Sequence, residues 1–193
     1  DGRLVHGKRL PSRGENFEAY SQLGAVLGRT CVHGDVRKVV LDAYDELADE
    51  RPKVDLTYGE AAWCSGGGEL APHRTHQNGL SVDFMVPVVD ADGEPTSFPA
   101  WPWTKFGYAV DFDDSGTRDG LRIDFSALAA HLLALDDAAT EHGIRIHRVI
   151  LAPNLRDELF AAERGCEVKR QIDFLEGGAW VEHDEHYHVD FGQ

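Results

Sequence analysis

The segment SALAAHLLALDDAATEH, residues 126–142, constrains the fold more than any other part of the chain. Its serine is a typical helix cap, its Ala and Leu residues form an apolar stripe, and Gly143 just beyond its end is a typical helix stop. Residues 144–151, which include Ile144, Ile146 and the apolar end Val-Ile-Leu, follow at once and are expected to form a buried strand. A helix that leads straight into a buried strand predicts a domain of helices packed on a sheet.

Patterns elsewhere in the chain predict further helices and strands. Apolar residues at 3.6-residue spacing predict a helix that begins with Asp35 as its cap and ends at Pro52. The other expected elements are strands over residues 54–58, 80–88 and 179–191, and a shorter helix over residues 154–164 that Gly165 ends. We therefore predict an α+β fold: a single domain, residues 1–193, with a central, mainly antiparallel sheet flanked by helices. Residues 1–34, rich in Gly, Arg and Ser, predict an extended N-terminal arm lying on this domain.

The charge of the chain argues against two classes of partner. It carries 34 acidic and 19 basic residues, a formal net charge of −15, and its basic residues are scattered. Nucleic acids and anionic membranes repel such a surface, so neither is expected as a partner. No apolar run approaches the length needed to span a bilayer, so no membrane insertion is expected. The first residues, DGRLVHGKRL, contain no apolar segment of signal-peptide type.

Two short segments, HRTHQNGLSVDF and WVEHDEHYHVDF, hold five of the ten histidines. A catalytic zinc site usually has three ligands from His, Asp and Glu, which leaves one position for water. His76 precedes the turn-forming Asn-Gly pair and Asp83 lies on the strand that leaves the turn, so the two side chains can meet. On the second strand His186 and His188 point to the same side, so one can bind metal while the other stands beside the water. The two segments thus predict a zinc site on the sheet.

Other segments are open to a structural or a functional interpretation. The glycine-rich loop CSGGGELAP, residues 64–72, lacks the Gly-Lys-Ser/Thr of a phosphate-binding loop and precedes no helix, which favours a flexible loop near a pocket. Trp101 and Trp103 lie in a proline-rich surface segment and either line a binding groove or cover the edge of the core. A single histidine is more often a surface or hydrogen-bonded residue than a ligand. The spacing of the histidines is therefore needed to distinguish a metal site from chance clustering.

That spacing resembles the metallopeptidase superfamily of lysostaphin-type enzymes and D-Ala-D-Ala peptidases, and most closely the penicillin-insensitive murein endopeptidase family. The family has a glycine-rich loop and then His-x-x-His-x-x-Gly-Leu-x-Val-Asp, which here reads GGGELAPHRTHQNGLSVDF. It also has a tryptophan before a His-x-x-His-x-His strand, which here reads AWVEHDEHYHVDF. Weaker similarities in KRLPSRGENFEAYS, VHGDV and RVILAPNLRDEL extend the likeness over most of the chain.

The resemblance implies roles for the matching residues. The implied zinc ligands are His76, Asp83 and His188. The implied catalytic residues are His186, as the base, and His183, beside the water or the developing oxyanion. The metal ion would be Zn²⁺, which suits this set of nitrogen and oxygen ligands.

Four further residues have roles that the resemblance leaves open. His73 matches another histidine of the family, close to the metal or the substrate, and His33 matches one in an early segment. Glu185 competes with His186 for the role of base, because related D-Ala-D-Ala peptidases use a Glu-x-x-His pattern with glutamate as base. Strand alternation puts Glu185 on the face opposite His188 and so favours His186. Asp190 adds a carboxylate that could raise the pKa of water on the metal or recruit other metals.

The function implied by the resemblance is zinc-dependent hydrolysis of peptidoglycan cross-links, at the bond between D-alanine and meso-diaminopimelic acid. The alternatives are a D,D-carboxypeptidase or dipeptidase of the same superfamily, and a non-catalytic, zinc-bearing cell-wall-binding module. An enzyme that hydrolyses the cell wall has to reach it, so the resemblance implies a periplasmic or otherwise exported protein. A disulfide among Cys31, Cys64 and Cys166 is then expected, and Cys31–Cys64 is the suggested pair.

Overall fold

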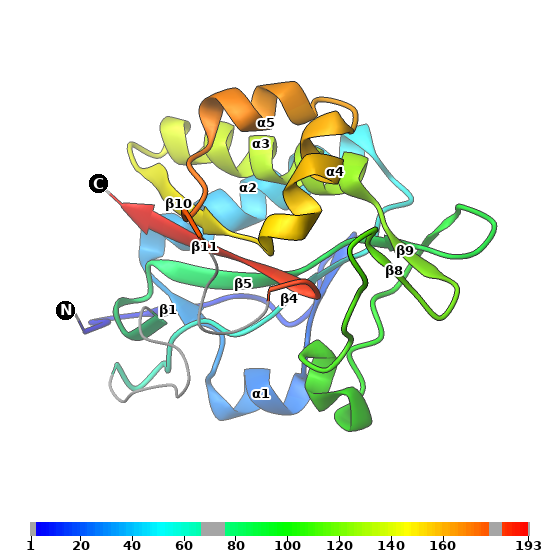
Figure 1. Ribbon diagram of the computed structural model, residues 1–193. Helices are drawn as coiled ribbons and strands as arrows, with labels where there is room; N and C mark the ends of the chain where they lie inside the picture. Colours follow the sequence, from blue (N-terminus) through cyan, green and yellow to red (C-terminus); the bar gives the residue numbers. More distant parts are fainter. Residues whose placement is uncertain (1–2, 67–75, 178–182, 193) are drawn as a thin grey trace.

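A five-stranded sheet forms the centre of the computed structural model, which describes residues 3–66, 76–177 and 183–192 (Figure 1). The strand order is β10 (Arg145–Ile150), β11 (His186–Gly192), β5 (Ser81–Met85), β4 (Leu56–Tyr58) and β2 (Phe17–Ala19). Neighbouring strands run antiparallel except β2 and β4, which are parallel. The predicted α+β fold with a central, mainly antiparallel sheet is confirmed.

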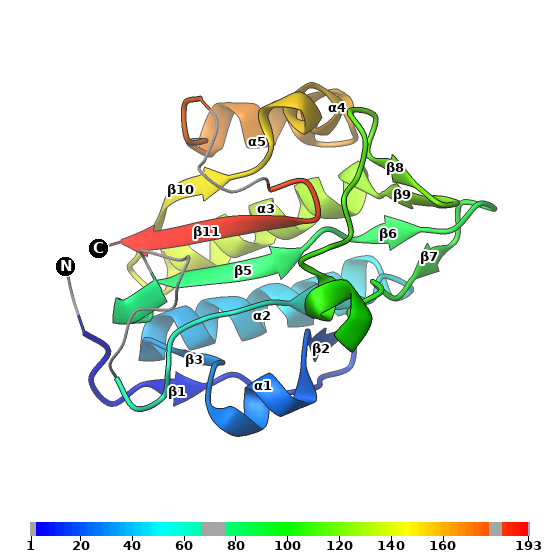
Figure 2. The same ribbon diagram turned by 60° about the horizontal axis from the view of Figure 1, so that its bottom comes forward.

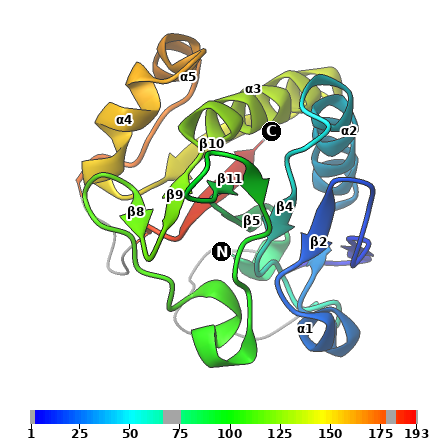
Figure 3. The same cartoon turned by 90° about the vertical axis from the view of Figure 1, so that its right-hand side faces the viewer.

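Four helices lie on one side of this sheet, and α2 and α3 run side by side along it (Figures 1 and 3). They are α2 (Gly34–Glu50), α3 (Phe125–Glu141), α4 (Arg156–Ala161) and α5 (Gly165–Gln171). The apolar residues of α2 at helical spacing are all buried, namely Val36, Val39, Val40, Ala43, Tyr44 and Leu47. The main core therefore fills the space between the helices and the sheet. In the part of the chain that the structure describes, the helices are too short or too polar to cross a bilayer.

Two smaller sheets extend the central one (Figure 2). One has the order β7 (Pro95–Thr96), β6 (Val88–Val89), β9 (Leu121–Ile123) and β8 (Thr117–Arg118), and the other pairs β1 (Lys8–Arg9) with β3 (Cys31–Val32). The single strand expected over residues 80–88 is therefore divided between β5 and β6, which belong to different sheets. The last expected strand, residues 179–191, is described only from residue 183, and its pairing begins at His186.

The structure corrects the caps expected for the two long helices. Helix α3 is capped by Asp124, whose carboxylate accepts hydrogen bonds from the amides of Ser126 and Ala127, so the helix begins one residue before the expected serine cap. Helix α2 is capped by His33, whose Nδ1 accepts from the amide of Asp35 at 3.3 Å. Asp35 instead lies in the first turn, where a negative charge favours the helix dipole.

The C-terminal helical region also differs from the expected single helix over residues 154–164. A short 3₁₀ helix, η3 (Pro153–Leu155), leads into α4, and Gly165 begins the additional helix α5 rather than ending a helix. The reason is a close approach: a Cβ on Gly165 would lie 2.1 Å from the carbonyl oxygen of Leu159. Glycine is needed here to pack one helix against the end of the other.

The N-terminal segment is more than the extended arm expected from its composition. It contributes strand β2 to the central sheet and contains the short helix α1 (Gln22–Leu27). Leu10, Phe17 and Tyr20 are buried in the main core. Alternation of apolar and polar residues over such short elements is too brief to reveal them in the sequence.

The two faces of the central sheet have different neighbours. Phe84 of β5 and Tyr187 of β11 point toward the helices, where both contact the ring of His131 on α3. Alternation along a strand therefore turns Asp83 and His188 toward the opposite face. Helix α1, drawn in blue, and the 3₁₀ segment η2 (Pro102–Gly107), drawn in green, lie on that side (Figures 1 and 3).

Candidate metal centre

His76, Asp83 and His188 meet on the face of the central sheet that points away from the helices. His188 and Asp83 are direct partners in the register of β11 and β5. His188 Nδ1 lies 2.8 Å from Asp83 Oδ1, and His76 Nε2 lies 3.3 Å from the same oxygen. One ligand atom from each residue falls within 4.8 Å of the others, and all three residues are buried. The structure thus brings together the three residues that the sequence nominates as ligands.

A tight turn delivers His76 to this position. The 3₁₀ helix η1 (His76–Asn78) is followed by Gly79 in the left-handed conformation, with φ of 72°. The Asn78 side chain accepts a hydrogen bond from the amide of Leu80 at 2.9 Å, and the carbonyl of Gly79 accepts one from the amide of His33. The expected Asn-Gly turn between the first two ligands is therefore present, and His33 fixes the turn instead of joining the ligands.

The three residues form a set that could hold a metal ion. Two imidazoles and one carboxylate, all buried, suit a borderline-soft divalent ion and leave coordination positions for water or substrate.

Tyr108 holds the second oxygen of Asp83. Its hydroxyl donates to Asp83 Oδ2 at 3.0 Å and accepts from the amide of Glu60 at 2.9 Å. Burial, followed by the charges of Asp83 and Glu60, raises the pKa of Tyr108 well above its usual value, so the hydroxyl keeps the proton that it donates. Nothing in the sequence pattern singles out Tyr108, because it lies 25 residues from Asp83 in a segment without motif.

Asp190 holds the far side of the His188 ring. His188 Nε2 lies 2.8 Å from Asp190 Oδ1, and Ser81 donates to that oxygen at 2.6 Å, while Arg148 contacts Oδ2. Such a carboxylate fixes the orientation of a ligating imidazole and raises its basicity. The Asp190 carboxylate is therefore engaged by His188, Ser81 and Arg148, so it orients the His188 ring and is not a free carboxylate.

The charges in this cluster support each other. Burial alone would lower the pKa of His188, but its hydrogen bonds to Asp190 and Asp83 outweigh burial and raise the pKa to about 9. Burial would raise the pKa of Asp83, but His76 and His188 together hold it well below its usual range. Without a metal the cluster thus favours a protonated His188 between two carboxylates. Metal binding would release that proton.

His186 lies beside the ligand cluster. Its ring is 5.0 Å from the ring of Tyr108 and 4.5 Å from that of His183, measured between centroids. Its Nδ1 lies 3.1 Å from Glu185 Oε1, and within the described residues its buried Nε2 has no hydrogen-bond partner. Burial would lower the pKa of His186, but its hydrogen bond to the Glu185 carboxylate and the charge of Asp83 raise it. One nitrogen is thus fixed by a carboxylate and the other is available for proton transfer.

Glu185 does not follow the strand alternation expected for it. Pairing of β11 begins at His186, and Glu185 lies in the bend before it, so strand parity does not set the direction of its side chain. Its carboxylate is buried against His186. His183 is also buried and lies next to His186. His73 lies outside the described residues, as do residues 67–72 of the glycine-rich loop.

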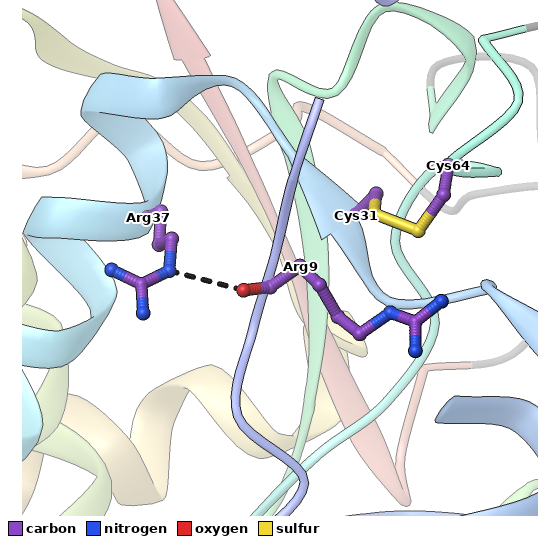
Figure 4. The surroundings of a disulfide bond; sticks show 4 residues. All are labelled: Arg9, Cys31, Arg37 and Cys64. Atoms are coloured by element: carbon purple, nitrogen blue, oxygen red, sulfur yellow. Dashed lines mark hydrogen bonds between the residues drawn. A yellow bond between two sulfur atoms is a disulfide. The ribbon is translucent and has the colours of Figure 1, made fainter. Parts of the chain in front are cut away.

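Cys166 is an exposed free cysteine. A disulfide joins Cys31 and Cys64, the pair suggested from the sequence (Figure 4). It ties β3 to the segment that follows β4. Nearby, Arg37 donates to the carbonyl oxygen of Arg9 at 3.0 Å and so fastens β1 to α2. Disulfides persist in oxidising compartments, which indicates a protein that is exported from the cytoplasm.

Comparison with known proteins adds no assignment: no family model matches the chain, and no curated protein matches it significantly.

Proposed function

We propose that the chain is a zinc-dependent endopeptidase that hydrolyses the peptide cross-links of peptidoglycan, at the bond between D-alanine and meso-diaminopimelic acid. The observation that carries the proposal is the buried group of His76, Asp83 and His188, with His186 beside it. The substrate class rests on the resemblance of both histidine segments to murein endopeptidases. The Cys31–Cys64 disulfide supports a location outside the cytoplasm, where the substrate lies.

His186 is the proposed general base. When bound, zinc would supply a Lewis acid that polarises the scissile carbonyl and lowers the pKa of water. His186 would accept a proton from the attacking water at Nε2 and pass it to the nitrogen of the leaving amine, which completes the hydrolysis. The Glu185 carboxylate on Nδ1 would hold the neutral ring in the tautomer whose Nε2 carries the lone pair, and would stabilise the imidazolium formed in between.

His183 and Tyr108 complete the polar surroundings of this reaction. His183 lies next to His186, where its ring can donate a hydrogen bond to the oxyanion that develops on the scissile carbonyl. Tyr108 touches both Asp83 and His186, so it links the position of a metal ligand to that of the base. The proposed mechanism uses no serine nucleophile, so β-lactams, which acylate serine, are expected not to inhibit.

Digestion of purified sacculi tests this function. Zinc-loaded protein and a chelated control are incubated with sacculi, and the muropeptides are separated and identified by mass spectrometry. Loss of cross-linked dimers with a matching gain of monomers, in the zinc-loaded sample alone, is the expected result. Intact dimers shortened by one alanine would replace the endopeptidase with a carboxypeptidase. Unchanged muropeptides, cleavage that survives chelation, or inhibition by penicillin would each contradict the proposal.

A further inference from the structure

Two tryptophans stand exposed on the same side of the sheet as the metal centre. Trp101 and Trp103 are 55% and 79% exposed, whereas most large apolar side chains of the described residues are buried. Their rings are nearly parallel, with centroids 5.7 Å apart and an interplanar angle of 14°, which is an offset stack. This tryptophan pair takes no part in the metal centre or in the core, so its exposure needs another explanation.

The backbone holds the tryptophan pair in place. The Thr104 hydroxyl donates to the carbonyl of Pro99 at 2.7 Å and accepts from the amide of Trp101 at 3.0 Å. Just after it, Lys105 and Phe106 both have positive φ, of 50° and 58°, which are strained values for residues with side chains. These hydrogen bonds hold the segment that carries the tryptophan pair in a defined conformation.

The same segment leads directly to the metal centre. Tyr108 ends η2, and its hydroxyl donates to Asp83. Tyr108 comes five positions after Trp103, so their Cα atoms lie at most about 18 Å apart. A ligand extended over the tryptophan pair is therefore within reach of a substrate bound at the metal centre.

The chemistry of the tryptophan pair selects among possible ligands. Nucleic acid and anionic lipid are disfavoured by the net charge of −15. A stable protein interface buries about 800 Å² on each partner, whereas two indole side chains bury roughly 300–500 Å². A neutral pyranose suits the pair, because one face of the sugar ring presents C–H groups that stack on indole and its hydroxyls remain in water.

We infer that Trp101 and Trp103 form a sugar-stacking site for the glycan strand that carries the peptide cross-links. The inference rests on the proposed function for the identity of the polymer, but binding of the sugar does not depend on hydrolysis. The tryptophan pair thus holds the glycan while the attached peptide reaches the metal centre, and intact sacculi become a better substrate than short soluble peptides.

The probe is the β-1,4-linked hexamer of N-acetylglucosamine, titrated by calorimetry into the full chain. Trp103→Ala is expected to weaken binding by about tenfold or more, the size of effect found when an aromatic stacking platform is truncated. Leu23→Ala, which truncates another exposed apolar side chain on α1, is the matched control and is expected to bind as wild type. Both sites are exposed, and unchanged thermal unfolding verifies that both variants fold.

The outcomes separate this inference from the proposed function. Binding that Trp103→Ala loses and Leu23→Ala keeps supports the sugar site, even if sacculi are not cleaved. No binding by wild type, or equal binding by Trp103→Ala, overturns it, even if sacculi are cleaved. Sedimentation with phosphatidylcholine vesicles provides a second arm. Binding of vesicles in place of the sugar would overturn the inference in favour of a lipid surface.

Discussion

Tyr108 donates a hydrogen bond to Oδ2 of Asp83 at 3.0 Å, and so leaves Oδ1 directed at the two histidines of the metal centre. One oxygen of the Asp83 carboxylate is thus held by Tyr108, and the other faces His76 and His188. A ligating carboxylate that is held by such an outer hydrogen bond keeps its orientation when the metal leaves. The finding yields two predictions about metal affinity.

Tyr108→Phe removes the hydroxyl and is expected to lower zinc affinity by about 10–100-fold. Asp83 then loses its outer hydrogen bond while its buried charge remains. Competition against a chromophoric chelator measures the change. Tyr20→Phe is the matched control, because the Tyr20 hydroxyl donates to Glu60 at 3.3 Å and not to a ligand. Equal zinc affinity in Tyr108→Phe and wild type would show that the bond has no role in metal binding.

Gly59→Ala is expected to disrupt the same hydrogen bond between Tyr108 and Asp83 by displacing the tyrosine. A Cβ on Gly59 would lie 2.5 Å from the Tyr108 hydroxyl and 3.0 Å from Asp83 Cβ, so the tyrosine has to move. The loss of zinc affinity should match that of Tyr108→Phe, and the double variant should lose little more, because both changes remove one interaction. Gly34→Ala is the control, since a Cβ there meets nothing within 4 Å. Fully additive losses would contradict the shared cause.

His131 is expected to make stability depend on pH. Burial lowers its pKa to about 3, against 6.5 in the unfolded chain. As pH falls below 6.5, the His131 imidazole takes up a proton in the unfolded chain before it does so in the folded protein. Stability is therefore lost between pH 6.5 and 3, by on the order of 5 kcal/mol when the titration is complete. Urea unfolding of metal-free protein at a series of pH values measures this. His131→Gln should flatten the dependence, and the exposed His147→Gln should keep it; identical slopes in all three proteins would refute the assignment.

The Cys31–Cys64 disulfide is expected to stabilise the fold by restricting the unfolded chain. It closes a separation of 33 residues, for which loop entropy predicts about 3–4 kcal/mol. The double variant Cys31→Ser, Cys64→Ser should lose that amount in the free energy of unfolding from denaturant titration. Cys166→Ser, at the exposed free cysteine, should unfold as wild type. A double variant as stable as wild type would mean that the bond does not constrain the unfolded state.

The sequence was informative where side-chain type and spacing carry the signal. Helix α2 could be predicted because its buried residues recur at one period, and the ligands because a turn and a strand each place histidine or aspartate at a fixed offset. Tyr108 and Gly59 could not be predicted, since their roles arise only when β4, β5 and the end of η2 meet in space. The prediction that Gly165 ends a helix was wrong, because a glycine that ends a helix and one that permits close packing look alike in sequence.

The central claim is that His186 acts as base beside a metal held by His76, Asp83 and His188. The most direct test follows hydrolysis of a soluble D-alanyl–meso-diaminopimelyl cross-linked dimer by wild type, His186→Ala and Glu185→Gln, with zinc content measured in each sample. We predict one zinc per chain in all three and loss of turnover by about 10²–10⁴-fold in His186→Ala. Glu185→Gln should lose less, because its amide oxygen can still accept the hydrogen bond from His186 Nδ1 although the charge is gone. Full activity in His186→Ala with loss in Glu185→Gln would contradict the account and make the glutamate the base.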